Sequence, residues 1–216
     1  MRGIQIGEYH TGEDWGLLLN SKSVNPPTPK VVTVTVDGRD GDLDLSEALT
    51  GEIRYNNREA SFGFLLTEGT QIERENLIDE IINAVHGLRT NIILPDDPDH
   101  YLVGRCSVSE VKNDRAYGSL RIVANCEPYR YSLIEVTRTI TATETPTDFA
   151  LHNSGRKTVT PTLEVTGSVT LVYGTTSVGL ETGTYKLPSL LLKRGATTLT
   201  ISGSGKVVFT YREAVV

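Results

Sequence analysis

Residues 70–88 read TQIERENLIDEIINAVHGL, and this stretch decides the fold class because it is the one segment with a helical repeat. Thr70 and Glu73 have the types and spacing of a capping box, in which each side chain bonds the other residue's backbone N–H. Apolar residues then recur at helical spacing, at Ile78, Ile81, Ile82 and Val85. Gly87 supplies a C-terminal stop. We therefore predict a helix over about 71–87.

Alternating apolar and polar residues on both sides of this helix predict strands. They lie at 32–36, 51–55, 62–66, 92–94, 101–111 and 117–125. In the first of these, Val32, Val34 and Val36 alternate with threonines, which indicates a half-buried strand that ends at the glycine-aspartate turn 37–41. A single helix among strands predicts an α+β N-terminal part.

The two cysteines fall on the arms of the hairpin expected at 101–125. A reversal about Asn113 and Asp114 pairs Cys106 with a residue near 121 or 122. Cys126 then lies four or five residues further along, which is about 13 Å at ~3.3 Å per residue. Because that distance exceeds disulfide reach, we expect two free thiols in small core positions and a reducing folding compartment.

Charge and composition change near residue 133. Residues 1–133 contain 13 Lys and Arg against 21 Asp and Glu, whereas residues 134–216 contain 8 against 6. Residues 134–216 also hold 19 threonines, and their short alternating segments are separated by glycine-containing turns, among them 167–168 and 203–205. We predict two domains, 1–133 and 134–216, the second an antiparallel β-sandwich. The fold class is therefore mainly β, with an α+β N-terminal part.

Acidic clusters resemble metal sites only in part. Asp40, Asp42 and Asp44 begin like a calcium-binding loop, but Leu45 stands where that loop needs glycine and Gly51 where it needs glutamate. The acidic segment 95–100 contains two prolines and favours an exposed loop. We expect no metal site.

No motif for catalysis or cofactor binding is complete. Gly203-Ser204-Gly205-Lys206 lacks the earlier glycine, the hydroxyl residue and the following helix of a phosphate loop. Ser154 and Lys157 have the Ser-x-x-Lys spacing without its partner motifs. The net charge of −6 disfavours general nucleic-acid binding, and no apolar run approaches the ~20 residues that cross a bilayer. We therefore predict no catalytic residue, no cofactor and no membrane partner, and favour a structural or binding role.

Five segments, in this order and over nearly the whole chain, carry a resemblance to a known family. They are Gly7 with 14–17 (DWGL), 37–45 (DGRDGDLDL), 55–64 (YNNREASFGF), 83–87 with 101–105 and 126–131 (NAVHG, YLVGR, CEPYRY), and 203–213 (GSGKVVFTYRE). Their combination resembles the distal tail (Dit) proteins of long-tailed, non-contractile bacteriophages.

This resemblance implies a non-enzymatic role at the tail tip of a virion assembled in the bacterial host cytoplasm. Proteins of the family form hexameric rings through an N-terminal belt domain, from which a galectin-like C-terminal sandwich projects. They link the tail tube protein to the tail-tip proteins, among them the tail-associated lysin, and to receptor-binding proteins. DNA is expected to pass through the lumen without specific binding, which suits the acidic N-terminal part.

Ring contacts are expected where apolar residues are exposed in the monomer. The candidates form one set, Trp15, Leu17, Leu18 and Leu19. The alternative is that Trp15 covers the local core.

Two other functions stay open on the sequence. A carbohydrate-binding module would present exposed aromatic faces, for which Tyr173, Tyr185 and Tyr211 are available. A tail-associated hydrolase would need two carboxyl groups at a fixed separation in a cleft.

Overall fold

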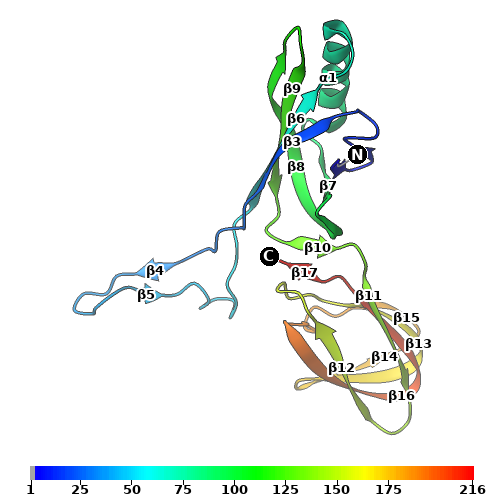
Figure 1. Ribbon diagram of the computed structural model, residues 1–216. Coiled ribbons are helices and arrows are strands. Elements are labelled where there is room, and N and C mark those ends of the chain that lie inside the picture. Colours follow the sequence, from blue (N-terminus) through cyan, green and yellow to red (C-terminus); the bar gives the residue numbers. More distant parts are fainter. Residues whose placement is uncertain (1–2) are drawn as a thin grey trace. The chain divides into compact units, whose positions relative to one another are not determined.

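The computed structural model describes residues 3–216, and the chain divides into two compact units. Unit 1 comprises Met1–Arg130 together with Val216, and unit 2 comprises Tyr131–Val215. The division lies between Arg130 and Tyr131, whereas the sequence placed it after residue 133. Figure 1 labels the elements of both units.

Unit 1 contains a large antiparallel sheet, a separate two-stranded sheet of β4 and β5, and α1, the one α-helix of residues 3–216. The strand order of the large sheet is β2-β1-β7-β8-β9-β6-β3, so β3 forms one edge. The elements are β1 (Gln5–Ile6), β2 (Tyr9–His10), β3 (Leu18–Val24), β4 (Thr33–Val34), β5 (Leu43–Asp44), β6 (Arg58–Leu66), α1 (Gln71–Val85), β7 (Arg89–Leu94), β8 (Asp97–Asn113) and β9 (Gly118–Cys126). The predicted strands at 62–66, 92–94, 101–111 and 117–125 are thereby confirmed.

The helix begins as predicted and ends slightly earlier. Thr70 Oγ1 accepts a hydrogen bond from Glu73 N (3.3 Å), and Thr70 N donates to Glu73 Oε2 (2.7 Å), which completes the capping box. The helix ends at Val85, because His86 is extended and Gly87 follows at φ 82°.

Arg74 fastens the start of the helix to the β8–β9 turn. Its buried guanidinium donates to Gly69 O (2.6 Å), Asp114 O (2.7 Å) and Asn113 Oδ1 (3.2 Å). A buried arginine is tolerated here because carbonyl and amide oxygens satisfy its donors.

The core of unit 1 lies between α1 and one face of the sheet. Alternate residues of β6, β8 and β9 point into it, and α1 adds its apolar stripe. The largest fully buried side chains of this core are Ile4, Ile6, Leu17, Phe62, Phe64, Ile78, Ile81, Ile92, Leu102, Leu120 and Ile122.

Both cysteines are free and buried in this core, although the expected register is wrong. Cys106 pairs with Ala124, so Cys126 is only two residues further along β9. The chain reverses later than expected, since Asp114 N donates to Tyr117 O (3.0 Å), and a bulge at Glu110 (φ 51°) shifts the register. Burial raises the pKa of Cys106 to about 11 and that of Cys126 to about 12.

Unit 2 is an antiparallel sandwich. The strands of the sandwich are β11 (Val136–Ala142), β12 (Thr147–Asn153), β13 (Thr162–Tyr173), β14 (Thr176–Leu180), β15 (Gly183–Lys186) and β16 (Gly195–Tyr211), and the short strand β17 (Ala214–Val215) that follows is not part of this sheet. One half of the long strands β13 and β16 pairs with β15 and β11, and the other half pairs with β14 and β12. Both halves contribute to a single core, so the curled sheet forms both layers (Figure 1).

The glycines at 167 and 203–205 do not end strands, contrary to the turns expected there. They lie in the middle of the antiparallel ladder between β13 and β16, with Gly167 opposite Gly205 and Val169 opposite Gly203. A Cβ on Gly167 would lie 2.4 Å from Ser204 O, and one on Gly203 would lie 2.5 Å from Ser168 O. Both glycines have positive φ, so they permit a close approach of the two backbones within continuous strands.

The chain enters and leaves unit 2 along neighbouring strands. β10 (Arg130–Ser132) pairs with β17, and Ser132 N donates to Glu213 O (3.0 Å). The two ends of unit 2 are therefore hydrogen-bonded to each other.

Candidate assembly surfaces

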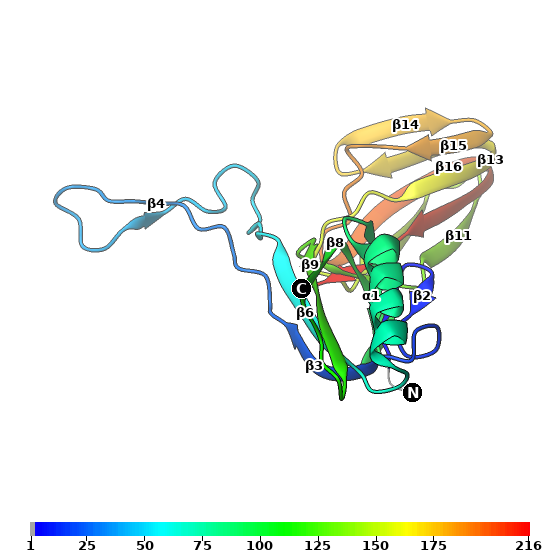
Figure 2. The same cartoon turned by 90° about the horizontal axis from the view of Figure 1, so that it is seen from above.

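Residues 25–57, which we call the arm, connect β3 to β6 and extend away from the sheet of unit 1 (Figures 1 and 2). The two limbs of the arm are joined near their base by backbone hydrogen bonds. Lys30 N donates to Arg54 O (2.7 Å), and Asn56 N donates to Thr28 O (2.9 Å). The arm therefore leaves unit 1 as a paired structure.

Two strand predictions are wrong in the arm. Residues 51–55 form no strand, and the β-pairing of Tyr55 is an isolated bridge with Pro29. The strand expected at 32–36 is reduced to β4, paired with β5 alone. With no further strand or helix beside it, a two-stranded ladder gains little stability and stays short.

The β4–β5 hairpin has one apolar face, and this face is exposed. Val34 pairs with Leu43, and Leu45 N donates to Val32 O (2.8 Å), so alternate residues of both strands share a face. Val32, Val34 and Val36 expose 55%, 44% and 42% of their surface. The predicted alternation is present, but no core of unit 1 covers it.

The opposite face of the hairpin is polar, and its side chains form hydrogen bonds within the hairpin. Thr33 pairs with Asp44, and Thr35 Oγ1 donates to Asp42 Oδ1 (2.9 Å). Hydrogen bonds from the side chain and backbone of Ser46 hold the pKa of the Asp44 carboxyl below its usual value. The hairpin is thus amphipathic, with one face suited to water and one to a protein surface.

A second apolar group projects from the returning limb of the arm. Residues 46–51 turn, closed by a hydrogen bond from Gly51 N to Glu47 O (2.7 Å), and Leu49 at this turn is 98% exposed. A large aliphatic side chain in full contact with water adds to the apolar surface of the arm.

The structure separates the four residues predicted as ring contacts. Trp15 and Leu17 are 5% and 1% exposed and belong to the core of unit 1, so the expected exposure is wrong for them. Trp15 stacks on Tyr9 with ring centroids 4.9 Å apart. Leu19 is partly buried against the same core, and Leu18 is 40% exposed. Only Leu18 offers a substantial apolar surface.

Leu18 lies at one end of the sheet, beside the β8–β9 turn. It pairs with Leu65 on β6, which pairs with Ser119 on β9, which pairs with Lys112 on β8. Leu65, Lys112 and Tyr117 also line a depression of about 260 Å³, and Tyr117 is 48% exposed. We call Leu18, Leu65, Lys112, Arg115 and Tyr117 the hairpin-end patch.

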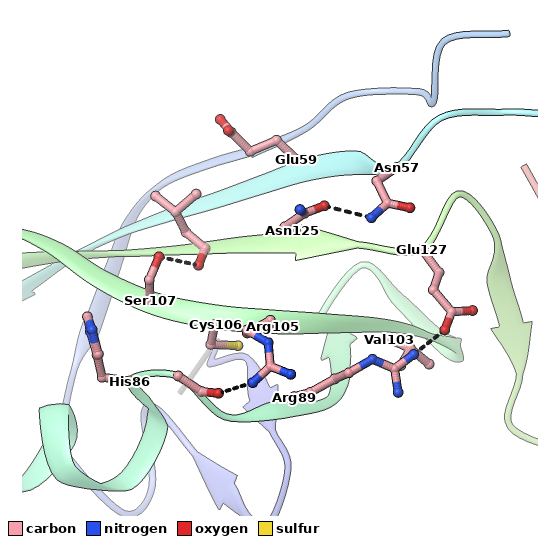
Figure 3. A pocket seen from close by; sticks show the side chains of 12 residues that line it. Asn57, Glu59, His86, Arg89, Val103, Arg105, Cys106, Ser107, Asn125 and Glu127 are labelled. Atoms are coloured by element: carbon pink, nitrogen blue, oxygen red, sulfur yellow. Dashed lines mark hydrogen bonds and ion pairs between the residues drawn. The ribbon is translucent and has the colours of Figure 1, made fainter. Parts of the chain in front are cut away.

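A larger depression of about 530 Å³ lies on the sheet face turned away from the core (Figure 3). Its polar groups are paired with one another. Arg105 donates to Gly87 O (2.6 Å), Arg89 forms an ion pair with Glu127, and Asn57 Nδ2 donates to Asn125 Oδ1 (3.0 Å). This face is a polar surface of balanced charge and contains no nucleophile–base pair among the hydrogen bonds of its described residues.

The acidic segment 95–100 forms ion pairs rather than a metal cluster. Asp96 pairs with Lys22, whose hydrogen bond lowers the pKa of the Asp96 carboxyl. Asp97 accepts hydrogen bonds from Arg130 Nη1 (2.7 Å) and pairs with His100 Nδ1 (2.7 Å). No group of three metal-ligating side chains comes together within residues 3–216.

The tyrosines named for sugar binding lie in or against the core of unit 2. Tyr173 and Tyr211 are buried there, and Tyr185 packs against the same cluster. Tyr211 Oη donates to His152 O (2.6 Å), and Tyr173 Oη is bonded to Ser189 Oγ (2.7 Å). Tyr173 and Tyr211 therefore present no open ring face to a sugar.

Sequence reasoning missed the arm and the hairpin-end patch as surfaces. The alternation at 32–36 did predict an apolar face in the arm. Alternation does not indicate whether residues of the same chain cover that face. The patch had no comparable signal, since it joins residues of three strands and of the β8–β9 turn. Across the described part of the chain, no helix is both long and apolar enough to span a bilayer.

The chain has the fold of a phage tail hub protein of known structure. That protein is the SPP1 Dit protein (gp 19.1), described as a paradigm of the hub adsorption apparatus in phages that infect Gram-positive bacteria. The two structures superpose with a TM-score of 0.69 over 98% of this chain and 99% of that chain, at 17% sequence identity. No protein-family model and no curated protein matches the sequence significantly. The predicted fold class is confirmed, and the resemblance found in the sequence holds for the fold.

Proposed function

We propose that this chain is a structural, non-catalytic component of a phage tail, and that it forms a hexameric ring at the tail tip through unit 1. The observation that carries the proposal is the amphipathic arm. It exposes a continuous apolar face on a hairpin that is too small to be stable by itself.

The arm suits self-association of the head-to-tail kind. A closed ring requires two different surfaces on each copy, so that one surface of a copy binds the other surface of its neighbour. An arm that extends from a compact sheet supplies one such surface. The shared fold with the SPP1 Dit protein supports a place for the ring in an adsorption apparatus.

The proposed partners are a tail tube protein on one side of the ring, and the tail-tip proteins, including a tail-associated lysin, and receptor-binding proteins on the other. DNA would pass through the lumen without specific binding. The excess of acidic residues in 1–133, 21 against 13 basic ones, supports this because like charges discourage adhesion of phosphate. The proposed location is the virion, after assembly in the bacterial host cytoplasm.

Native mass spectrometry and negative-stain microscopy of the full chain test the proposal. We expect a hexameric ring whose population grows with protein concentration. Replacing Val32 and Val34 by serine removes apolar surface from the exposed face, and we expect this variant to stay monomeric with an unchanged circular dichroism spectrum. Thr33→Ser, on the polar face, is the matched control and should assemble normally. A wild-type chain that stays monomeric at every concentration, with and without the tail tube protein, contradicts the proposal.

A further inference from the structure

We propose that Arg58 and Arg130 form a binding site for a small phosphate-type oxyanion at one end of the large sheet of unit 1. This inference goes beyond the proposed function and does not depend on ring formation. It rests on two neighbouring guanidinium groups, each of which keeps a buried N–H without a hydrogen-bond partner in the described part of the chain.

Arg58 is a buried cation without a counter-ion. It is the first residue of β6, lies opposite Cys126 at the end of β9, and is only 6% exposed. It shares the core face of the strand with the fully buried Ala60 and Phe62. Its Nε has no hydrogen-bond partner, and Arg58 forms no ion pair within residues 3–216. Because an unpaired buried ion is unfavourable, this arrangement favours a bound anion.

The other buried arginine of unit 1 shows what Arg58 lacks. Arg74 is 3% exposed, and its guanidinium donates to two carbonyl oxygens and to the side-chain oxygen of Asn113. The chain therefore satisfies a buried guanidinium completely where it uses one to join two segments. The N–H groups of Arg58 have no such set of acceptors, which indicates that the acceptor is a ligand.

Arg130 supplies the second guanidinium. It begins β10, which pairs with β8, and Gly104 of β8 lies opposite Cys126. Its Nη1 donates to Asp97 Oδ2 (2.7 Å) and its Nη2 donates to Val216 O (3.1 Å), whereas its Nε is buried and without a partner. One side of this guanidinium is thus held within unit 1, and the Nε side is left for a ligand.

The charges around the two arginines do not cancel. Desolvation and the positive charge of Arg130 lower the pKa of Arg58, so the two cations repel each other. Burial raises the pKa of the Cys126 thiol to about 12, so this neighbour carries no charge at pH 7. Asp97 balances one of the two cations. An anion placed between the guanidiniums would remove the repulsion and balance the other.

The arrangement favours a tetrahedral oxyanion over other anions. Two guanidiniums on different strands present N–H groups from different directions, and phosphate has enough oxygens to accept from both. A single carboxylate is occupied by one guanidinium fork. A polymer such as DNA cannot bring its phosphates to a side chain that is 6% exposed. Bound phosphate would fasten the start of β6, directly after the arm, to β10.

Thermal unfolding of the full chain in different salts tests the site. Inorganic phosphate at several times its dissociation constant should raise the Tm by about 2–4 °C relative to chloride of equal ionic strength, because it binds only the folded chain. Arg58→Gln should abolish this shift. Arg54→Gln, at an exposed arginine of the arm, is the matched control and should keep it. The comparison of these two variants removes the general effect of phosphate on protein stability.

Two further measurements do not depend on the folding of Arg58→Gln. Arg58→Lys keeps the charge but not the planar fork, and should weaken phosphate binding by about tenfold in calorimetric titrations. Crystals of the unaltered chain soaked in selenate should show anomalous density between the two guanidiniums.

Four results would overturn the inference. An equal phosphate shift in Arg58→Gln and Arg54→Gln would mean that the anion binds elsewhere. An equal response of the unaltered chain to acetate would exclude selection of a tetrahedral anion. A DNA oligonucleotide that gives a shift dependent on Arg58 would show that the site is open to a polymer. Selenate density absent from the two arginines would mean that water satisfies their N–H groups.

Discussion

Two strands of unit 1 carry the same alternation of apolar and polar residues, and their surroundings are opposite. Phe62, Phe64 and Leu66 of β6 point toward α1 and are almost fully buried. Val32, Val34 and Val36 of the arm follow the same period of two and remain open to water. The pattern specifies an apolar face, whereas the chain around it decides whether that face becomes a core or a binding surface.

The difference in burial between β6 and β4 arises from the neighbours that each strand has in the fold. β6 lies between β3 and β9, and its apolar side chains share one core with α1, so each gains contacts on several sides. β4 pairs only with β5, and no third element of unit 1 covers the hairpin. The apolar face of the hairpin therefore stays open to solvent.

The largest expected effect is on the buried face. Phe62→Ala should lower the free energy of unfolding by about 3–5 kcal/mol, because it removes a fully buried ring and leaves a cavity. Urea denaturation of the monomeric protein, followed by circular dichroism, measures the change. A loss below ~1 kcal/mol would mean that β6 is not part of a tightly packed core.

A smaller effect is expected at α1, which packs on β8 and β9. Thr70→Ala removes the N-cap and should lower the free energy of unfolding by about 1 kcal/mol. Thr67→Ala, in the preceding loop, is the control and should be close to neutral.

The same cap predicts a pH dependence. Hydrogen bonds from the Thr70 backbone and side chain lower the pKa of Glu73. A lowered folded-state pKa contributes stability above the unfolded-state pKa, and this contribution is lost as the pH falls through the folded-state value. The stability difference between wild type and Glu73→Gln should therefore shrink in acid. A difference that grows as the pH falls would contradict the capping geometry.

The smallest effect is expected on the exposed face. Val34→Ala should change the unfolding free energy of the monomer by no more than about 0.5 kcal/mol, because the side chain is already open to solvent. The same variant should weaken assembly, measured by sedimentation velocity. Substantial destabilisation of the monomer would show that the arm packs on its own unit, and the contrast with β6 would disappear.

Local signals in the sequence were sufficient for the helix and the strands beside it. The capping box at Thr70 and Glu73 and the apolar repeat from Ile78 to Val85 act within a few residues of each other, so they predict α1 nearly to its ends. The alternation at 62–66 identifies β6 for the same reason.

Features that depend on distant residues were predicted less well. The glycines at 167 and 203–205 have the composition of turns, and only their position opposite each other makes them a close approach of two paired strands. The bulge at Glu110 shifts the register and so changes the partner of Cys106 on β9. No glycine stands at the bulge to indicate it in the sequence. The sequence left Trp15 between a ring contact and the local core, and the structure places it in the core.

The hydrogen bond between Ser132 and Glu213 has a consequence for how such a chain can vary. Unit 2 starts and finishes on adjacent strands, β10 and β17, so its two ends lie side by side. A different module with similarly spaced ends can therefore take its place without rerouting any of the strands β1 to β9.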